Sequence, residues 1–124
     1  QNMMPQGAEL ILGVKRDAQF GPMLLAGLGG VFVEVFGDSS LYPIPLNKNE
    51  AYEMLKSLKS YKMLTGYRGT PPRDIDAVVE MMVAISEFAR KNKDRLCELD
   101  INPLFVYGEG AGVGVADALV VLEE

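Results

Sequence analysis

Helical periodicity is confined to the middle of this 124-residue chain, and strand-like segments lie on both sides of it. Four apolar stretches precede it, bounded by Gly, Pro or Asp turn residues. They cover residues 9–16, 23–26, 31–36 and 41–46. Two more, 96–107 and 113–122, flank a glycine-rich loop after it. Strands, then helices, then a hairpin predict one α+β domain, 1–124, with a mostly antiparallel sheet and helices packed on one face.

Two helices are expected in the middle section. The first covers about residues 50–60, with Asn47 or Asn49 as its N-cap. The second covers about residues 75–91 and ends in lysines that suit the helix dipole. Its expected apolar face consists of Ile75, Val78, Val79, Met82, Ile85, Phe88 and Ala89.

Glycines and prolines refine the expected strands. Gly13, inside the first stretch, indicates a bulge or a close approach of another backbone segment. Residues 27–30, which include three glycines, are expected to form a turn. The two prolines of residues 41–46 favour an edge position for that strand, because proline cannot donate to a neighbour.

Charge and residue usage exclude several classes of function. With 12 basic against 17 acidic residues, the net charge of −5 is a poor match for nucleic acid or an anionic membrane. No apolar run approaches the roughly 18 residues that span a bilayer. The single cysteine, Cys97, suggests a core residue in a reducing cytosol, so we expect a cytoplasmic protein. The absence of histidine excludes His-dependent triads and His-ligated zinc within this chain.

The segment 97–104, CELDINPL, is the most informative about chemistry. Glu98, Asp100 and Asn102 alternate, so on a strand they share one face. The residues between them, Cys97, Leu99 and Ile101, are expected to face the core. Adjacent oxygen-bearing side chains are costly to bury without a partner, and a hard cation is one such partner.

The last hairpin adds a carboxylate to this group. A turn centred between Glu109 and Gly110 pairs residues whose numbers sum to 219, which places Asn102 opposite Asp117 with Cβ atoms about 5 Å apart. An amide and a carboxylate suit Mg²⁺, which takes few protein ligands. The alternative is a solvated strand face in which Asp100 and Asn102 close a turn, and the glycine-rich loop leaves the register open to slippage.

Five segments, in this order and spacing, resemble the C-terminal half of the ATP-grasp module of ADP-forming acyl-CoA synthetases, such as acetyl-CoA synthetase. They are GAELILGVKRDAQFGP, GLGGVFVEVFGD, GYRGTPPRDIDA, ELDINPL and VADA. The resemblance covers residues 1–122 and extends more distantly to the β chain of succinyl-CoA synthetase. It implies an ATP-grasp C-terminal subdomain, and we expect the N-terminal half to lie outside these 124 residues.

The resemblance also implies roles for individual residues. Asn102 and Asp117 would hold the Mg²⁺ of ATP or ADP, and Asp100 would be catalytic by orienting a phosphohistidine delivered by another domain. Glu9 matches a position that can bond the ribose hydroxyls, and residues 1–4 resemble a linker that contacts adenine. One departure stands out: Leu119 occupies a position where the family usually has a basic residue aimed at the phosphates.

The function implied is that of an acid–thiol ligase. The parent protein would interconvert acyl-CoA, ADP and phosphate with free acid, CoA and ATP, through a phosphohistidine on a CoA-binding domain of the same chain or of a partner subunit. We expect no turnover from the 124 residues alone, because they lack histidine. The alternative is a non-catalytic regulatory or scaffold domain, such as the ATP-grasp-like module fused to lysine acetyltransferases, and Leu119 favours it.

Overall fold

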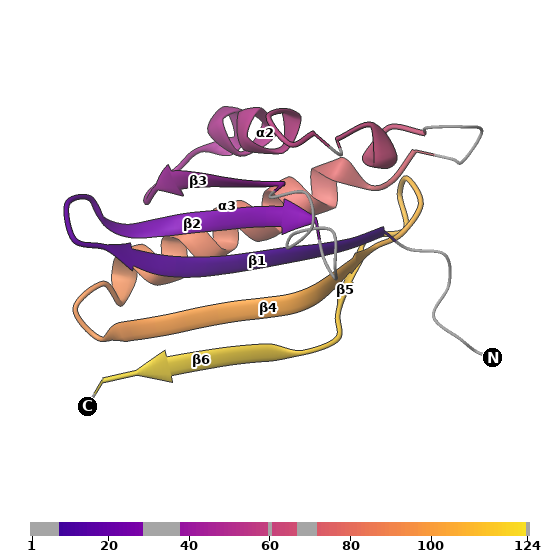
Figure 1. The fold of residues 1–124 in the computed structure, drawn as a ribbon. Coiled ribbons are helices and arrows are strands. Elements are labelled where there is room, and N and C mark those ends of the chain that lie inside the picture. Colours follow the sequence, from indigo (N-terminus) through magenta and orange to yellow (C-terminus); the bar gives the residue numbers. More distant parts are fainter. Residues whose placement is uncertain (1–7, 29–37, 60, 67–71, 124) are drawn as a thin grey trace.

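The computed structural model describes residues 8–28, 38–59, 61–66 and 72–123, and these form a six-stranded antiparallel sheet with two α-helices (Figure 1). The strands are β1 (Ala8–Asp17), β2 (Gly21–Leu28), β3 (Ser39–Pro43), β4 (Leu96–Val106), β5 (Val113–Val115) and β6 (Ala118–Leu122). Their order is β3-β2-β1-β4-β5, and β6 also pairs with β4. The predicted α+β class is confirmed. The strand expected at residues 31–36 lies outside the described residues.

The helices follow their predicted positions. The second, α3 (Ile75–Lys91), has the expected bounds and is N-capped by Asp74. The first, α2 (Lys48–Lys56), is shorter than predicted and is followed by a 3₁₀ turn, η1 (Tyr61–Leu64). Asn47 is its cap, because the Asn47 side chain accepts from the Glu50 N–H at 2.8 Å and the Glu50 carboxylate accepts from the Asn47 N–H at 2.8 Å.

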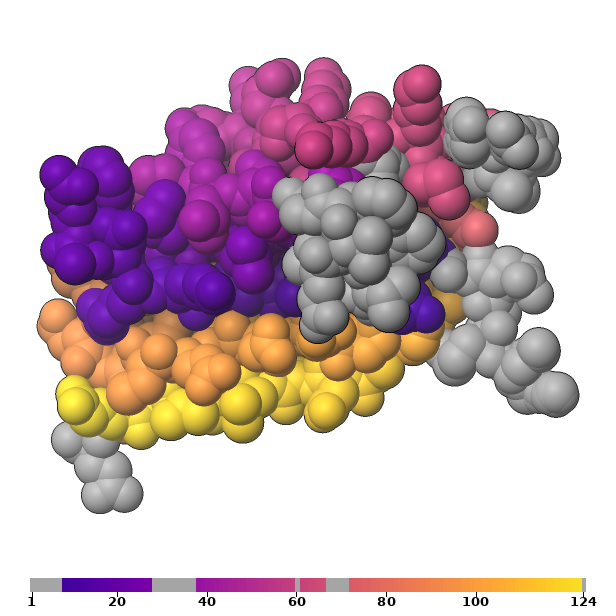
Figure 2. Space-filling view, in the orientation of Figure 1, coloured from indigo at the N-terminus to yellow at the C-terminus, as the bar shows by residue number. Residues whose placement is uncertain are grey.

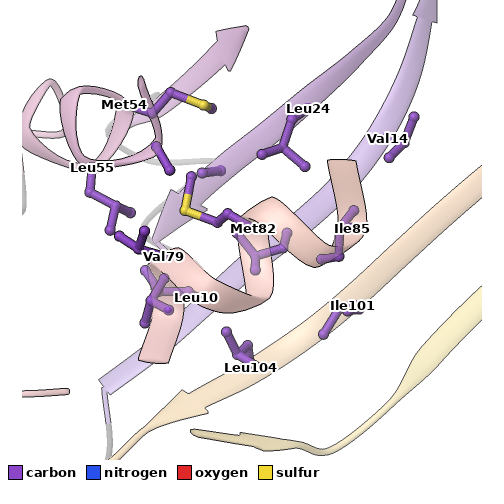
Figure 3. Packing of buried hydrophobic residues seen from close by; sticks show 14 of the residues in the cluster. Leu10, Val14, Leu24, Met54, Leu55, Val79, Met82, Ile85, Ile101 and Leu104 are labelled. Carbon is purple, nitrogen blue, oxygen red and sulfur yellow. The ribbon is translucent and has the colours of Figure 1, made fainter. Parts of the chain in front are cut away.

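A single core lies between the helices and one face of the sheet. Alternate residues of β1 (Leu10, Leu12 and Val14) are buried and belong to the same cluster as Val79, Met82 and Ile85 of α3 (Figure 3). The helix α2 packs on α3 and β3, and places Met54 and Leu55 in this cluster. The prediction that the helices lie on one face is therefore confirmed.

One core prediction for α3 was wrong, and one buried residue of this helix was not predicted. Phe88 is 37% exposed, whereas Ser86 is fully buried on the inner face of α3. The Ser86 hydroxyl accepts a 3.0 Å hydrogen bond from the Leu46 N–H, which satisfies it inside the core. A serine gives no apolar signal in a periodicity count, so only the buried partner reveals its place.

Glycines in the sheet allow close approach of neighbouring backbone. A Cβ at Gly13 would lie 2.9 Å from the Leu99 carbonyl oxygen, so the predicted close approach is confirmed. Gly27 was expected in a turn, but it lies within β2, is buried and pairs with Ser39. A Cβ there would be 3.0 Å from the Asp38 carbonyl oxygen, which explains the glycine without a turn.

The prediction that Cys97 lies in the core was also wrong. The register of β4 against β6 changes between Leu96, which pairs with Leu122, and Glu98, which pairs with Val121. Cys97 is the extra residue of this bulge and is exposed. Leu96 and Leu99, three residues apart, are both buried as a result. Along the described part of the chain, no helix has the length and apolarity to span a membrane.

Candidate functional site

A second bulge of β4 lies at the proposed metal ligand. Leu10 pairs with Leu104 and Leu12 with Ile101, so two residues of β4, Asn102 and Pro103, lie opposite Ile11 alone. Leu104 and Ile101 are both buried although three residues separate them. The bulge thus shifts the alternation of side chains between the two faces of β4 by one residue, so that buried residues continue on both sides of it. Bulges of this kind often lie beside functional sites.

The predicted register of the final hairpin is confirmed. The pairs from Glu98↔Val121 to Val106↔Val113 all sum to 219. Between β5 and β6 the chain departs from strand geometry at Ala116 and Asp117, yet the same pairing continues there. The Asn102 N–H donates to the Asp117 carbonyl oxygen at 3.2 Å, and the Ala116 N–H donates to the Pro103 carbonyl oxygen at 3.2 Å. Asn102 and Asp117 are therefore cross-strand neighbours.

The four predicted site residues share one side of the sheet, which we call the site face: the face away from α3, seen from the front in Figure 1. Ile101 is buried under the helices and pairs with Ala118, so strand alternation places Asp100, Asn102 and Asp117 on the opposite face. Glu9 precedes the buried Leu10 and lies on that same face by the same alternation.

Asp100 is bordered on the neighbouring strands by two residues that carry no charge. It pairs with Gly13 of β1 on one side and with Leu119 of β6 on the other. A Cβ at Gly13 would lie 3.6 Å from Asp100 Oδ1, so the glycine keeps the carboxylate uncovered from that side. Leu119 is 49% exposed, and the structure thus places the position that departs from the family pattern directly beside Asp100.

Carboxylates outnumber basic side chains on the site face among the described residues of β1, β4 and β6. Glu98 lies there with Glu9, Asp100 and Asp117, and Lys15, which follows the buried Val14 of β1, lies on the same face by alternation. The Asp117 carboxylate is oriented by its own strand, because Oδ1 accepts from the Ala118 N–H at 2.9 Å. Among the residues with assigned positions, no three His, Cys, Asp or Glu side chains form a group able to hold a metal. An Asn–Asp pair fits Mg²⁺, which completes its shell with water and phosphate oxygens.

Two aromatic residues near the end of β4, Phe105 and Tyr107, were not predicted as part of the site face. Phe105 pairs with Glu9 on one side and with Gly114 on the other, and is half-buried. The hydroxyl of Tyr107 lies 2.8 Å from where a Cβ of Gly114 would be, so the glycine makes room for this ring. Two aromatic residues at alternate positions after Pro103 were the available signal. Residues 1–4, expected near adenine, lie outside the described residues.

Comparison with known sequences connects this geometry to a set of characterised proteins. A sequence profile described as an ATP-grasp domain matches residues 1–122. Subunit beta of acetate–CoA ligase (ADP-forming) II from Pyrococcus furiosus is 41% identical over 121 residues, which are 98% of this chain and 51% of that protein. Acetate–CoA ligase (ADP-forming) I of Archaeoglobus fulgidus is 43% identical over 124 residues, all of this chain but 18% of that protein.

Solved structures show the same similarity. A protein of Pyrococcus horikoshii superposes with a TM-score of 0.91 at 38% identity, covering 98% of this chain and 51% of that one. The acetyl-coenzyme A synthetase 1 of Ca. Korarchaeum cryptofilum superposes with a TM-score of 0.89 at 42% identity, covering 98% and 55%. That protein was solved with coenzyme A and Mg-AMPPCP, its phosphohistidine segment pointing towards the nucleotide site. The chain thus spans about half the length of its shorter relatives.

Proposed function

Because the chain belongs to the ATP-grasp domain family, we propose that it forms the C-terminal half of the Mg·nucleotide site of an ADP-forming acyl-CoA synthetase. The observation that carries the proposal is the pairing of Asn102 with Asp117 at the β4 bulge, on the site face. An amide and a carboxylate held side by side on paired backbone form a pre-positioned half-shell for a hard cation.

Asn102 and Asp117 would hold the magnesium ion through their side-chain oxygens. Bound Mg²⁺ neutralises charge on the phosphates and holds them in line for transfer. The hydrogen bond from the Ala118 N–H fixes the Asp117 carboxylate, so little side-chain freedom is lost when the cation binds. In this proposal the two residues act by position, and the backbone hydrogen bond between them supports it.

Asp100 would position the acceptor of the phosphoryl group. In the proposed step a bond forms between an imidazole nitrogen and the γ-phosphorus, the bond from that phosphorus to the β–γ bridging oxygen breaks, and ADP leaves. The carboxylate accepts the N–H of the other ring nitrogen, so that the attacking nitrogen presents its lone pair. The histidine must come from another domain, because this sequence contains none.

Glu9 would accept hydrogen bonds from the ribose hydroxyls. It lies at the start of β1, paired with Phe105, whereas the bulge that carries Asn102 lies opposite Ile11, two residues further along β1. Two residues of a strand span about 6.6 Å. This separation allows one nucleotide to place its phosphates near Asp117 and its ribose near Glu9.

The similarity to ligases along the whole chain supports this function over a regulatory scaffold. A cytoplasmic acid–thiol ligase would use this chain together with a domain that binds CoA and carries the phosphohistidine. The phosphohistidine segment described for the Ca. Korarchaeum enzyme supports such a partner. Leu119 remains the residue that departs from the family pattern.

Calorimetric titration of the protein with ADP, with and without Mg²⁺, tests the proposal. We expect Asp117→Ala to weaken Mg²⁺-dependent ADP binding at least about tenfold, which corresponds to 1.4 kcal/mol. The matched control is Glu98→Gln, which removes a carboxylate from the same face but not from the proposed metal pair. An unchanged Mg²⁺ dependence in Asp117→Ala, or an equal loss in Glu98→Gln, would contradict the assignment.

A further inference from the structure

The two outer edges of the sheet differ in how they are protected. Among the strands that the structure describes, β3 forms one edge, and it ends in Pro43, with Pro45 two residues later. β6 forms part of the other edge, and its five residues, ALVVL, include neither proline nor charge (Figure 1). Natural proteins usually protect an exposed edge strand with prolines, charges or a covering element, because an unprotected edge can pair with another chain.

β6 exposes aliphatic side chains on both of its faces. Leu119 is 49% exposed and Val121 38%, both on the site face. Val120 is 47% exposed and Leu122 36%, both on the helix side, where α3 does not cover them. In Figure 2 the atoms of β6 form a continuous row along the lower rim of the molecule. Exposed aliphatic side chains gathered along an unpaired edge strand are typical of surfaces that bind another chain.

The backbone of β6 is oriented to accept one more strand. The bond from the Asn102 N–H to the Asp117 carbonyl fixes the alternation of the ladder, so Leu119 and Val121 also bond inward to β4. Val120 lies between them, and its N–H and C=O therefore point towards the outer edge. Within the described ranges, no strand pairs with β6 on that side.

The charges next to β6 select the kind of strand that fits. If a second copy of the chain paired antiparallel with all five residues of β6, Val120 of one copy would face Val120 of the other. Asp117 of each copy would then face Glu123 of the other, which gives two such pairs in each dimer. Like charges directly opposite each other destabilise a strand pair. A strand that places a basic residue opposite Glu123 avoids this repulsion and gains an opposite-charge pair instead.

We propose that β6 is a docking edge for an extended, aliphatic segment of another domain or subunit, which pairs antiparallel to β6 and carries a lysine or arginine opposite Glu123. The added strand would extend the sheet and cover the exposed side chains on both faces. Recognition of this kind combines main-chain hydrogen bonds, which give affinity, with side-chain contacts, which give specificity. The inference depends only on this edge and does not require nucleotide binding.

A labelled peptide that alternates valine and threonine and carries lysine at the position opposite Glu123 tests the proposal by fluorescence anisotropy. We expect saturable binding to the protein, and at least about tenfold weaker binding to Val120→Lys, which places a charge in the strip. The matched control is Leu41→Lys, an equally exposed leucine (51%) on the proline-protected edge β3, which should bind as the wild type does. Circular dichroism verifies that each variant is folded.

A charge exchange at Glu123 tests the selectivity independently. Glu123→Lys should weaken binding of the lysine peptide and strengthen binding of the same peptide with glutamate at that position, because the opposite-charge pair is restored. Failure of the wild type to bind either peptide, or equal binding by Val120→Lys and wild type, would overturn the proposal. If sedimentation shows a dimer that Val120→Lys dissociates, the strand that binds β6 belongs to a second copy of this chain and not to another domain or subunit.

Discussion

Gly13 is the residue at which the backbone leaves least room. Its absent side chain lets β1 approach the Leu99 carbonyl and keeps Asp100 uncovered on the site face. We expect Gly13→Ala to lower the free energy of unfolding by roughly 1–3 kcal/mol, because a Cβ 2.9 Å from a backbone oxygen forces the strands apart. Urea denaturation measures this loss.

Gly108→Ala is the control for this substitution. A Cβ at Gly108 would meet nothing within 4 Å, so the change should stay within about 0.5 kcal/mol. Equal effects of the two substitutions would show that the contact with the Leu99 carbonyl does not determine the loss of stability.

Leu119 offers a second prediction at the scale of single residues. Leu119→Lys places an ammonium group on the site face opposite Asp100, and a cross-strand pair of this kind contributes about 0.2–1 kcal/mol. We expect the variant to bind Mg·ADP a few-fold more tightly, because the new cation also approaches the phosphates. Leu41→Lys adds the same charge on β3 and should leave the affinity unchanged. An equal gain in both variants would indicate an effect of net charge alone.

At the scale of elements, the start of α2 depends on one side chain. Asn47 both caps the helix and receives the returning bond from Glu50. We expect Asn47→Ala to lower the free energy of unfolding by about 1 kcal/mol, the usual cost of losing an N-cap. Asn49→Ala, inside the first turn of the same helix, should be neutral or slightly stabilising because alanine favours helix. Thermal denaturation of both variants distinguishes the two asparagines.

The same cap gives α2 a dependence on pH. Hydrogen bonds from the Tyr42 hydroxyl (2.6 Å) and from the Asn47 N–H hold the pKa of the Glu50 carboxyl below its usual value. A folded-state pKa below the unfolded one gives stability that is full above the unfolded pKa and is lost as the pH falls through the folded pKa. Urea midpoints measured from pH 7 down to about pH 3 should therefore fall less steeply in Glu50→Gln than in the wild type.

Glu53→Gln serves as the control for the pH measurement. Its carboxylate lies on the same helix and has a loose ion pair with Lys56, at 3.8 Å between exposed groups. Such pairs contribute little. A change in the acid dependence as large as that of Glu50→Gln would argue against the Tyr42–Glu50 bond as the source.

The elements also show where sequence periodicity succeeds and where it stops. The bounds of α3 and the register of the last hairpin followed from period and turn position alone. In β4 the prediction failed at the first bulge, because a strict two-residue period assigns Cys97 to the core. The signal was present in the apolar spacing, since Leu96 and Leu99, and again Ile101 and Leu104, are three residues apart. The roles proposed for Asp100 and Glu9 came from family resemblance, because periodicity carries no information on chemistry.

For the molecule as a whole, the lack of histidine leads to a prediction about catalysis. The chain with Mg²⁺ and γ-labelled ATP should acquire no acid-labile label, because it has no imidazole to phosphorylate. Addition of CoA and acetate should likewise give no acetyl-CoA. Autoradiography after electrophoresis and a thiol assay measure the two outcomes. Turnover by the 124 residues alone would contradict the division of labour proposed above.

The hydrophobic core does not require two residues at the β4 bulge. Asn102 and Pro103 lie there, with Asp117 and Ala116 opposite them on the neighbouring strand. Buried residues flank the bulge on β4, and β1 offers Ile11 alone against the two residues of β4. Shortening both strands together, by deleting Asn102 and Asp117, and replacing Pro103→Val to restore the N–H that proline lacks, would leave residues 103 and 116 as an ordinary pair in an even ladder. We expect such a chain to keep its packing and to lack the affinity for a metal-bound nucleotide that is proposed for Asn102 and Asp117. On that assignment, folding and ligand binding depend on different residues of the same strands.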